Sequence, residues 1–472
     1  MATPLLAAAC TSDPDRSSSD VGAHTPTTTP GTARGTTVDI PDPGATLITR
    51  WAQDPWALGS YSYLPVGSSP DDRRALARPA GRLVLAGEAT SVDHPSTVHG
   101  AVLSGRRAAE QVRGLAPAGR TVIVIGAGAA GLAAAADLRA THAVTVVEAR
   151  DRTGGRVWTD RSLGYPVELG AGWIHGPDGN PLTDLARQAG VATVTMDWDD
   201  AVSYGADGAA FDVTAAETRT RDVLTDAATR GEELDADVPL ADLASRAMDD
   251  MKLSGREREA VDRTLVTEVE QEFAADLSQL SGWWWDEGRP FGGTDLAVTG
   301  GYDRILAPLA DGLDIRLGAP ARSVLWSDSG AAVVLDGATV EAAAVVLTVP
   351  ISVLQAGTPA LDPVLPEPWA GAVGRLGMGV LDKVVLAFDR VFWDDSWLLQ
   401  WRGPEGGDFA EWLNLDRAAG HPALVAFNAG STARRWEART DDAVAAGAMA
   451  ALRTVRFTCT GAGVRSGRGR DP

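Results

Sequence analysis

Apolar residues along this chain gather in short runs that alternate with glycine-rich turns and polar stretches. Residues 121–125 (TVIVI) and 143–147 (AVTVV) are apolar and largely β-branched, which predicts two buried strands. The stretch between them is rich in Ala and Leu and predicts a helix. A strand, a helix and a second strand in close succession are typical of an α/β protein.

Three more elements are predicted on either side of this unit. Residues 82–86 (RLVLA) predict a strand, and a helix should begin after Pro95, from Thr97 onward. Lys383 precedes the apolar run 384–386, so it is expected in a buried strand. A charged side chain there needs a reason, which makes Lys383 a candidate functional residue.

The two ends of the chain lack such patterns. Residues 11–36 are dominated by Ser, Thr and Pro, and residues 456–472 by Gly and Arg, so both are predicted to be disordered. The start, MATPLLAAAC, resembles the end of a bacterial lipoprotein signal, but no Lys or Arg precedes Cys10 and the apolar run is short. Two interpretations stay open: a start lost upstream of a lipidated Cys10, or a hydrophobic end without function.

Composition and charge narrow the class of function. The 472 residues predict two or three domains, and no apolar run is long enough for a transmembrane span. The formal charge of −21 argues against a nucleic-acid partner and favours the approach of cations such as amines. With two cysteines, Cys10 and Cys459, and six histidines, we expect no disulfide framework and no metal site.

The glycines after residues 121–125 follow the pattern Gly126-x-Gly128-x-x-Gly131. The first two allow a tight turn and a close approach to a pyrophosphate, and the third lets helix and strand pack closely. The helix N-terminus then offers free N–H groups to the phosphates. Glu148 ends the second strand, where its carboxylate can accept hydrogen bonds from an adenosine ribose. An acid at this position disfavours NADP, so the sequence predicts NAD or FAD.

The next residues favour FAD. Residues 148–156 (EARDRTGGR) resemble the EARxRxGGR run of FAD-dependent amine oxidases. Residues 168–176 (ELGAGWIHG) with GNPL at 179–182 are similar to polyamine and spermine oxidases. More runs recur in the same order in that family, at 300–302, 313–326, 347–350 and 376–394. The resemblance implies a Rossmann-like, glutathione-reductase-type FAD-binding domain with an α+β substrate-binding domain.

One part of the resemblance stands in an unusual place. Residues 51–62 and 82–112 resemble the segment that normally closes an amine oxidase at its C-terminus, yet here they precede the dinucleotide strand. The simplest description is a circular permutation bridged by residues 113–119, since permutation is tolerated where chain ends lie close. A rearranged or frameshifted gene product is the alternative, and both stay open.

The resemblance assigns cofactor and substrate roles residue by residue. Ser60 stands where monoamine oxidases bind flavin through a cysteine, so noncovalent FAD is expected. Lys383 is implied to hold a water at flavin N5, His175 to lie near the substrate nitrogen, and Tyr61 to flank the pocket. Trp173 and Thr97 complete the expected pocket. The predicted FAD-binding residues are Gly126, Gly128, Gly131, Glu148, Arg150, Gly155, Arg156, Val324, Glu88, Thr97 and Val98.

The expected organisation follows from these assignments. Residues 1–36 form a signal remnant or tether, 70–180 and 296–350 the FAD-binding domain, and 456–472 a tail. The substrate domain comprises 37–69, a mainly helical part at 181–295, and 351–455. The expected activity is oxidation of a primary or secondary amine, with a polyamine favoured and O2 as electron acceptor. An amino-acid oxidase, a desaturase and an inactive flavin-binding product remain alternatives. The chain as written is expected in the cytoplasm, or exported as a lipoprotein if its start lies upstream; its oligomeric state is not predicted.

Overall fold

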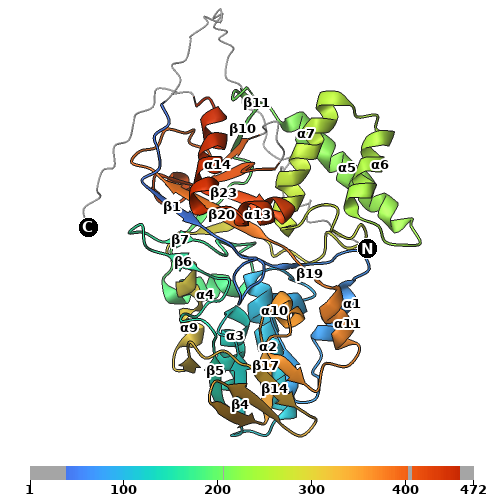
Figure 1. Ribbon diagram of the computed structural model, residues 1–472, viewed down its shortest axis with the longest axis vertical. Coiled ribbons are helices and arrows are strands. Elements are labelled where there is room, and N and C mark those ends of the chain that lie inside the picture. Colours follow the sequence, from blue (N-terminus) through green and yellow to red (C-terminus); the bar gives the residue numbers. More distant parts are fainter. Residues whose placement is uncertain (1–38, 206, 402–406, 458–472) are drawn as a thin grey trace, which may run out of the picture.

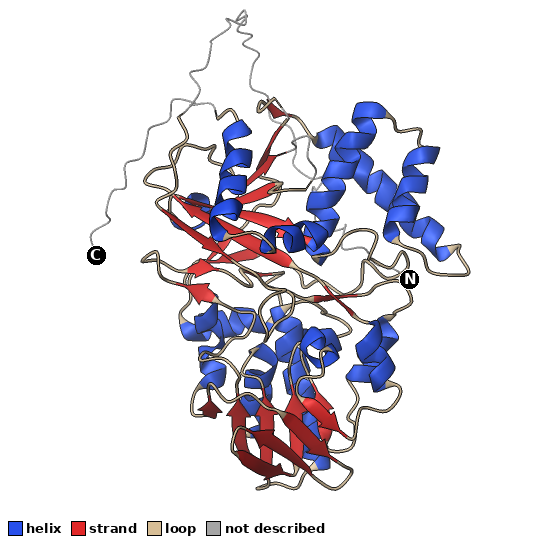
Figure 2. Cartoon of the chain, in the orientation of Figure 1, coloured by secondary structure: helices blue, strands red, loops and turns tan. Residues whose placement is uncertain are grey.

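The computed structural model describes residues 39–205, 207–401 and 407–457. In Figure 1 a lower body built on a parallel sheet stands below an upper body built on a larger mixed sheet. A group of helices lies beside the upper sheet (Figure 2). Cys10, Cys459, the predicted tether and the tail lie outside the described residues, so lipidation stays a prediction.

The lower body has a five-stranded sheet in which every neighbouring pair is parallel. Its strands in spatial order are β13 (Asp314–Arg316), β5 (Ala143–Val147), β4 (Thr121–Ile125), β17 (Ala344–Leu347) and β3 (Leu83–Leu85). The strands expected at 121–125 and 143–147 have these bounds, and the one expected at 82–86 is shorter by one residue at each end. Parallel strands buried on both faces form continuous apolar runs, which is why the pattern located them.

The two faces of this sheet pack in different cores, because successive residues of a strand point in opposite directions. Val122 and Val124 face a core shared with four helices, whereas Ile123 and Ile125 face a core shared with a four-stranded sheet. The helices are α2 (Val98–Leu115), α3 (Ala129–Leu138), α4 (Pro181–Ala189) and α9 (Tyr302–Ala310). The second sheet comprises, in spatial order, β16 (Ala338–Ala342), β15 (Ala331–Leu335), β14 (Ser323–Trp326) and β18 (Ala360–Asp362).

The upper body is built on a seven-stranded sheet. In spatial order it contains β1 (Ala45–Ile48), β20 (Leu381–Ala387), β23 (Ala423–Ala429), β22 (Glu411–Asn414), β21 (Leu398–Trp401), β10 (Ala201–Tyr204) and β11 (Ala210–Phe211). Strand β20 carries Lys383 where the apolar run predicts a strand. Val384 and Leu386 pack in one core and Val385 in another, so this strand is buried on both sides.

The other elements are short or cover these sheets. The helices beside the upper sheet are α5 (Thr214–Glu232), α6 (Leu240–Asp250) and α7 (Gly255–Leu265), continued by the π-helix η3 (Val266–Glu270) and α8 (Gln271–Phe273). Short helical segments are α1 (Pro70–Leu76), η2 (Glu88–Thr90), α4 (Pro181–Ala189), α10 (Ile351–Gln355), α11 (Trp369–Arg375), α12 (Leu415–Ala419), α13 (Gly430–Glu437) and the longer α14 (Asp441–Thr454). One small sheet has three strands, in the spatial order β8 (Trp173–Ile174), β12 (Leu296–Val298) and β9 (Thr193–Thr195). Two others have two strands each: β19 (Gly377–Met378) with β2 (Ser62–Tyr63), and β6 (Thr159–Asp160) with β7 (Val167–Glu168).

Residues 39–116 are built into both bodies. β1 pairs antiparallel with β20 in the upper sheet, and β3 pairs parallel with β17 at the edge of the lower sheet. α2 packs against α3, and Figure 1 shows α1 beside α11. These residues therefore complete the two sheets rather than forming a separate unit.

The packing differs from the predicted domain boundaries at two places. Residues 351–376 are assigned by the sequence to the substrate domain, yet Ile351 and Leu365 lie in a lower-body core and β18 pairs with β14. Leu182 of α4 likewise packs in the lower body. Apolar runs locate elements but do not say which core they join. Among the described residues, no helix has the length and apolar character needed to cross a membrane.

Candidate active site

A cavity of about 1540 Å³ lies between the two bodies, lined by residues of both. Most of the predicted site residues meet there, although they come from distant parts of the chain. Those that line it are Tyr61, Glu88, Thr97, Val98, Gly126, Gly128, Glu148, Arg150, Gly155, Arg156, Trp173, His175 and Lys383.

Two predicted cofactor-binding residues do not line the cavity. Gly131 lies in α3 where a Cβ atom would clash with the backbone oxygen of Gly126, so its role is close packing of helix and strand, as the motif predicts. Val324 is fully buried in the core beneath β14, and its assignment to FAD is wrong in this respect. Ala321, three residues earlier, lines the cavity instead. The error arises because a motif match does not say which side chains of a strand face inward.

The glycine loop forms an open cradle at one side of the cavity. Gly126 has φ of +103°, a conformation that favours glycine. A Cβ atom on Gly128 would meet only the backbone oxygen of Gly154, at 3.8 Å. Gly128 precedes α3, whose first N–H groups have no side-chain cap. A phosphate can therefore approach the helix N-terminus closely.

Glu148 organises the loop next to this cradle. Its carboxylate accepts hydrogen bonds from the backbone N–H groups of Ala127 at 2.7 Å and Arg150 at 2.8 Å. The Arg150 side chain pairs with Asp54 at 2.7 Å. Asp54 belongs to the segment before the dinucleotide strand, so that segment and the motif meet at the cavity.

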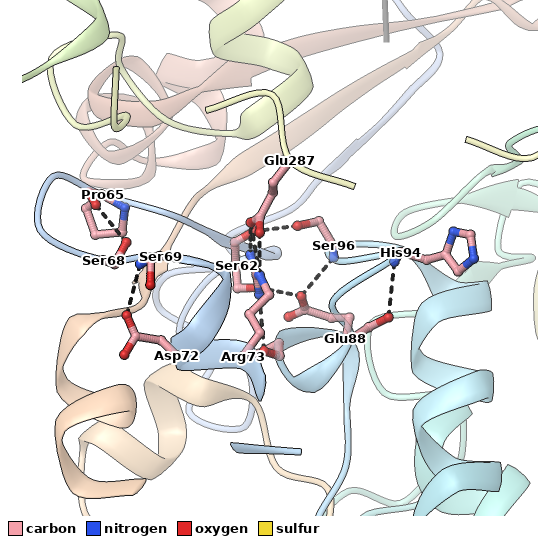
Figure 3. Close-up of polar contacts among 12 residues, drawn as sticks. Ser62, Pro65, Ser68, Ser69, Asp72, Arg73, Glu88, His94, Ser96 and Glu287 are labelled. Atoms are coloured by element: carbon pink, nitrogen blue, oxygen red, sulfur yellow. Dashed lines mark hydrogen bonds and ion pairs between the residues drawn. The ribbon is translucent and has the colours of Figure 1, made fainter. Parts of the chain in front are cut away.

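Glu88 is the centre of a buried polar network, drawn in Figure 3. Its carboxylate accepts hydrogen bonds from the Ser62 hydroxyl at 2.6 Å and from the Ser96 backbone N–H at 3.1 Å. Arg156 pairs with it at 2.9 Å. Burial alone would raise the pKa of Glu88, but the charges of Arg156 and Arg73 lower it, so Glu88 is ionised.

Arg73 connects this network to a distant loop (Figure 3). Its guanidinium is fully buried and donates to both carboxylate oxygens of Glu287, with Nε at 2.9 Å from each. It also donates to the Ser62 hydroxyl at 2.8 Å and to the backbone oxygen of Ala89 at 3.2 Å. Each of the three guanidinium nitrogens donates to an oxygen atom. Arg73 therefore joins the Glu88 network to the loop of Glu287.

The N-terminus of α2 also faces the cavity. Thr97 is its N-cap, and the Thr97 hydroxyl accepts a hydrogen bond from the Gly100 N–H at 3.0 Å. The first turn of α2 contains no acidic residue. A helix N-terminus carries partial positive charge, so Thr97 and Val98 stand where a negative charge in the cavity would be stabilised.

Lys383 is buried at the cavity wall. Its ammonium donates to the backbone oxygens of Glu168 at 2.9 Å and Gly170 at 2.6 Å, and lies 5.0 Å from the ring centre of Trp173. Burial lowers the pKa of Lys383 to about 8, and the Glu168 charge opposes that shift. Burial also raises the pKa of Glu168 to about 7. Burial thus disfavours the charged form of both side chains.

Tyr61 and Ser60 fix the wall next to Lys383. The Tyr61 hydroxyl donates to the backbone oxygen of Gln271 at 3.0 Å. The Ser60 hydroxyl donates to the backbone oxygen of Leu381 at 3.1 Å and accepts from its N–H at 2.8 Å. The two hydroxyls hold the 60–61 turn against β20, through Ser60, and against α8, through Tyr61.

His175 lies in the cavity wall with almost half of its side chain exposed. Its Nδ1 is 2.8 Å from a carboxylate oxygen of Asp295. The indole N–H of Trp198 donates to the same oxygen at 3.2 Å, and the Gly176 backbone N–H donates to the other at 2.9 Å. Burial alone would lower the pKa of His175, but the hydrogen bond and charge of Asp295 raise it.

Sequence reasoning missed four polar residues of this site. Arg73 lies 214 residues from Glu287 along the chain, and Asp295 lies 120 residues from His175 and 97 from Trp198. No local motif connects residues so far apart. Arg73 stands in the charged run PDDRRAL of α1, where Asp72 is also buried, so no local pattern singles it out.

The cavity fits FAD. The open cradle at Gly128 admits a pyrophosphate, Glu148 stands at the end of β5 for a ribose, and the α2 N-terminus suits the electron-rich end of a flavin. The other wall brings Lys383 and His175 to the same space. Among the described residues, no group of three His, Cys, Asp or Glu side chains is arranged to hold a metal ion.

Comparisons with known proteins agree on one family. The family model described as flavin-containing amine oxidoreductase matches residues 30–113 and 129–464. Probable polyamine oxidase 4 of Arabidopsis thaliana is 33% identical over 345 residues, covering 69% of this chain and 69% of that protein. Polyamine oxidase 4 of Oryza sativa subsp. japonica is 34% identical over 340 residues, covering 68% and 70%. A putrescine oxidase structure with bound putrescine shares the fold, with a TM-score of 0.58, 24% identity, and 72% of this chain and 82% of that chain covered.

Proposed function

This chain belongs to the flavin-containing amine oxidoreductase family and is an FAD-dependent amine oxidase, and on that premise we propose that it oxidises a primary or secondary amine, with polyamines favoured. The observation that carries this preference is the charge of the cavity wall, which Glu268, Glu272 and Asp295 line together with His175. Negative walls concentrate cationic ligands. The plant relatives named polyamine oxidases, and the structure solved with putrescine, support the same class of substrate.

One side of the cavity would bind FAD and the other the amine. Gly126, Gly128 and the N-terminus of α3 would hold the pyrophosphate of FAD, and Glu148 its ribose. Glu88, with Arg156, would meet the ribityl chain. When bound, FAD would accept a hydride equivalent from the carbon next to the amine nitrogen and pass the two electrons to O2. The products would be hydrogen peroxide and an imine, and the imine would then hydrolyse.

The remaining residues bind and orient the amine. His175 accepts a hydrogen bond from the substrate nitrogen, while Tyr61 and Trp173 exclude water around its carbon chain. Lys383 holds a water molecule near the reacting atoms. The positive end of α2, at Thr97 and Val98, stabilises the negative charge that develops on the cofactor side. Because only a neutral amine has a free electron pair, turnover should rise with pH as the substrate nitrogen loses its proton.

FAD is proposed to bind without a covalent bond. Ser60 lines the cavity, and its hydroxyl is occupied by the backbone of Leu381. Acid precipitation should therefore leave the yellow colour in the supernatant. A yellow pellet would overturn this part of the proposal.

The order of the parts is proposed to be a natural circular permutation with a Rossmann-like FAD domain. Support comes from β3 and β1, which pair with β17 and β20 rather than lying apart from the sheets. The decisive test is a gene in which residues 37–112 are moved behind residue 455. A permutation predicts that this chain folds with the same flavin spectrum, whereas a product of gene damage predicts no flavin in the parent chain.

The activity is tested by visible spectra of the purified protein without oxygen. Flavin bands that bleach with spermine, spermidine or an arylalkyl monoamine would support the proposal and identify the substrate class. Bleaching only with an amino acid or a carbon–carbon substrate would favour an amino-acid oxidase or a desaturase. Persistent bands with every substrate would favour a flavin-binding protein without this activity. Location in the cytoplasm or as an exported lipoprotein stays a prediction, to be tested by fractionation.

A further inference from the structure

Asp295, Trp198 and His175 meet at one edge of a small sheet. β8, β12 and β9 form three antiparallel strands with β12 in the middle. His175 follows the end of β8, Trp198 follows β9, and Asp295 precedes β12. Because neighbouring strands run in opposite directions, the ends of β8 and β9 meet the start of β12. The sheet therefore brings these three residues together at one edge, each in a loop next to a strand end.

The carboxylate of Asp295 receives three donors. One oxygen lies 2.8 Å from His175 Nδ1 and 3.2 Å from the Trp198 indole nitrogen, and the other accepts from the Gly176 N–H at 2.9 Å. An ionised carboxylate only accepts hydrogen bonds, so Nδ1 of His175 must carry a hydrogen. In the neutral ring Nε2 is then the acceptor. Since Nδ1 is engaged by Asp295 and the ring lines the cavity, Nε2 is left for a ligand.

We propose that Asp295 is a positioning residue for amine oxidation, which fixes the orientation and tautomer of His175 so that Nε2 accepts an N–H of the substrate amine. Trp198 tunes this contact by sharing the carboxylate oxygen. This inference rests on the proposed amine oxidation. It adds that the hydrogen bond between Asp295 and His175 sets the pH range in which His175 can accept a hydrogen bond. Protonated His175 has no acceptor, so its neutral form is the competent one.

The charges that act on His175 come from three elements. Asp295 precedes β12 and raises the pKa of His175, and Glu272 of α8 acts in the same direction. His99 of α2 is the third group, and its own pKa is lowered to about 3, first by burial and then by the His175 charge. His99 is therefore neutral near pH 7, and Asp295 supplies the main partner of His175.

Two substitutions should move the pH dependence in opposite directions. Asp295→Asn removes the negative charge beside Nδ1, so the pKa of His175 falls and the acid limb of flavin reduction moves to lower pH by about one unit. Trp198→Phe removes one donor from the carboxylate, so more of its charge acts on His175 and the limb moves to higher pH. Asp295→Glu keeps the charge and should restore most of the parent profile.

The measurement is the rate of flavin reduction at saturating amine, from pH 6 to 10, in the FAD-loaded enzyme. At saturation this rate reports groups in the enzyme–substrate complex. Asp178→Asn is the matched control, since Asp178 is an exposed acid three residues after His175 that does not line the cavity. In a His175→Gln background, Asp295→Asn should cause no further shift if Asp295 acts through His175.

A second readout separates this inference from the proposed function. The titration of the His175 ring, followed by NMR with His175→Gln for assignment, should shift with Asp295→Asn and Trp198→Phe as the rates do. If no amine reduces the flavin, the proposed function fails while this titration still tests the pair. Unchanged titration in both variants, or shifts in the same direction, would overturn the inference. If Asp295→Asn does not fold, the direction of the Trp198→Phe shift decides.

Discussion

The buried pair of Arg73 and Glu287 should be essential to stability. In Arg73→Met, Glu287, whose side chain is only 8% exposed, loses its three hydrogen bonds to the guanidinium. Glu88 loses one of the two cations that lower its pKa. Removing one partner of a buried ion pair costs about 3–5 kcal/mol. With an unfolding entropy of about 2.1 cal/mol/K per residue, a chain of 472 residues loses about 1 °C per kcal/mol, so the Tm should fall by roughly 3–5 °C.

The neighbouring residue provides a matched control. Arg74 pairs with Asp71 one turn away, but its side chain is 55% exposed. Such a pair contributes at most about 1 kcal/mol, so Arg74→Met should leave the Tm nearly unchanged. In the double variant Arg73→Met/Glu287→Leu the orphaned charge is also gone, so its loss should be smaller than the sum of the two single losses.

The assay is thermal unfolding at one fixed FAD concentration, because bound FAD raises the Tm by mass action. Circular dichroism follows the fold and flavin fluorescence follows release of FAD. Since the Arg73 network ends at Glu88 on the cavity wall, both signals should change at the same lowered temperature. A Tm for Arg73→Met within about 1 °C of the Arg74→Met value would refute the account of this network.

Three further predictions follow from the site. The Cβ of Gly128→Val has only the Gly154 backbone oxygen near it, at 3.8 Å, so this variant should lower stability by only about 1 kcal/mol while abolishing FAD absorbance. A Cβ on Gly131 clashes with the Gly126 backbone oxygen, so Gly131→Val should destabilise the apoprotein as well, as seen by urea unfolding. Lys383→Met should keep FAD but slow turnover by about 10²-fold or more, because a titrating group is lost from the cavity wall; equal rates would remove Lys383 from the mechanism. Burial and the neighbouring Glu437 raise the pKa of Asp382 well above its usual value, so its stabilisation is present at acid pH and lost as pH rises through the folded pKa. Asp382→Asn should thus weaken the decline of the urea midpoint between pH 5 and 8, and an unchanged slope would contradict this.

The sequence predicts those parts of the fold that depend on local pattern. The strands at 121–125 and 143–147 could be predicted because each is a nearly continuous apolar run. Gly126 and Gly128 could be predicted because a phosphate-binding turn requires its glycines at a fixed, short spacing. Val324 was misplaced because its apolar strand has two faces and the pattern names neither. The Asp295 pair with His175 is invisible in the sequence, since two long connections bring its members together.

The order of the segments changes which contacts are local. β3, α2, β4, α3 and β5 run without interruption from Leu83 to Val147, and α2 packs against α3. The packing of α2 on α3 and the β4–α3–β5 unit with its glycine cradle therefore form from contacts close in sequence, and such contacts form fast because little loop entropy is lost. The rest of the lower sheet does not, because β3 pairs with the distant β17. In contrast, Ala45 of β1 must find Ala387 of β20 across most of the chain. The β4–α3–β5 unit should thus be ordered before β3 joins β17 and before β1 joins the upper sheet. The cavity is complete only after these distant pairings, because the segment between β1 and β3 carries Ser60 and Tyr61 to β20 and α8.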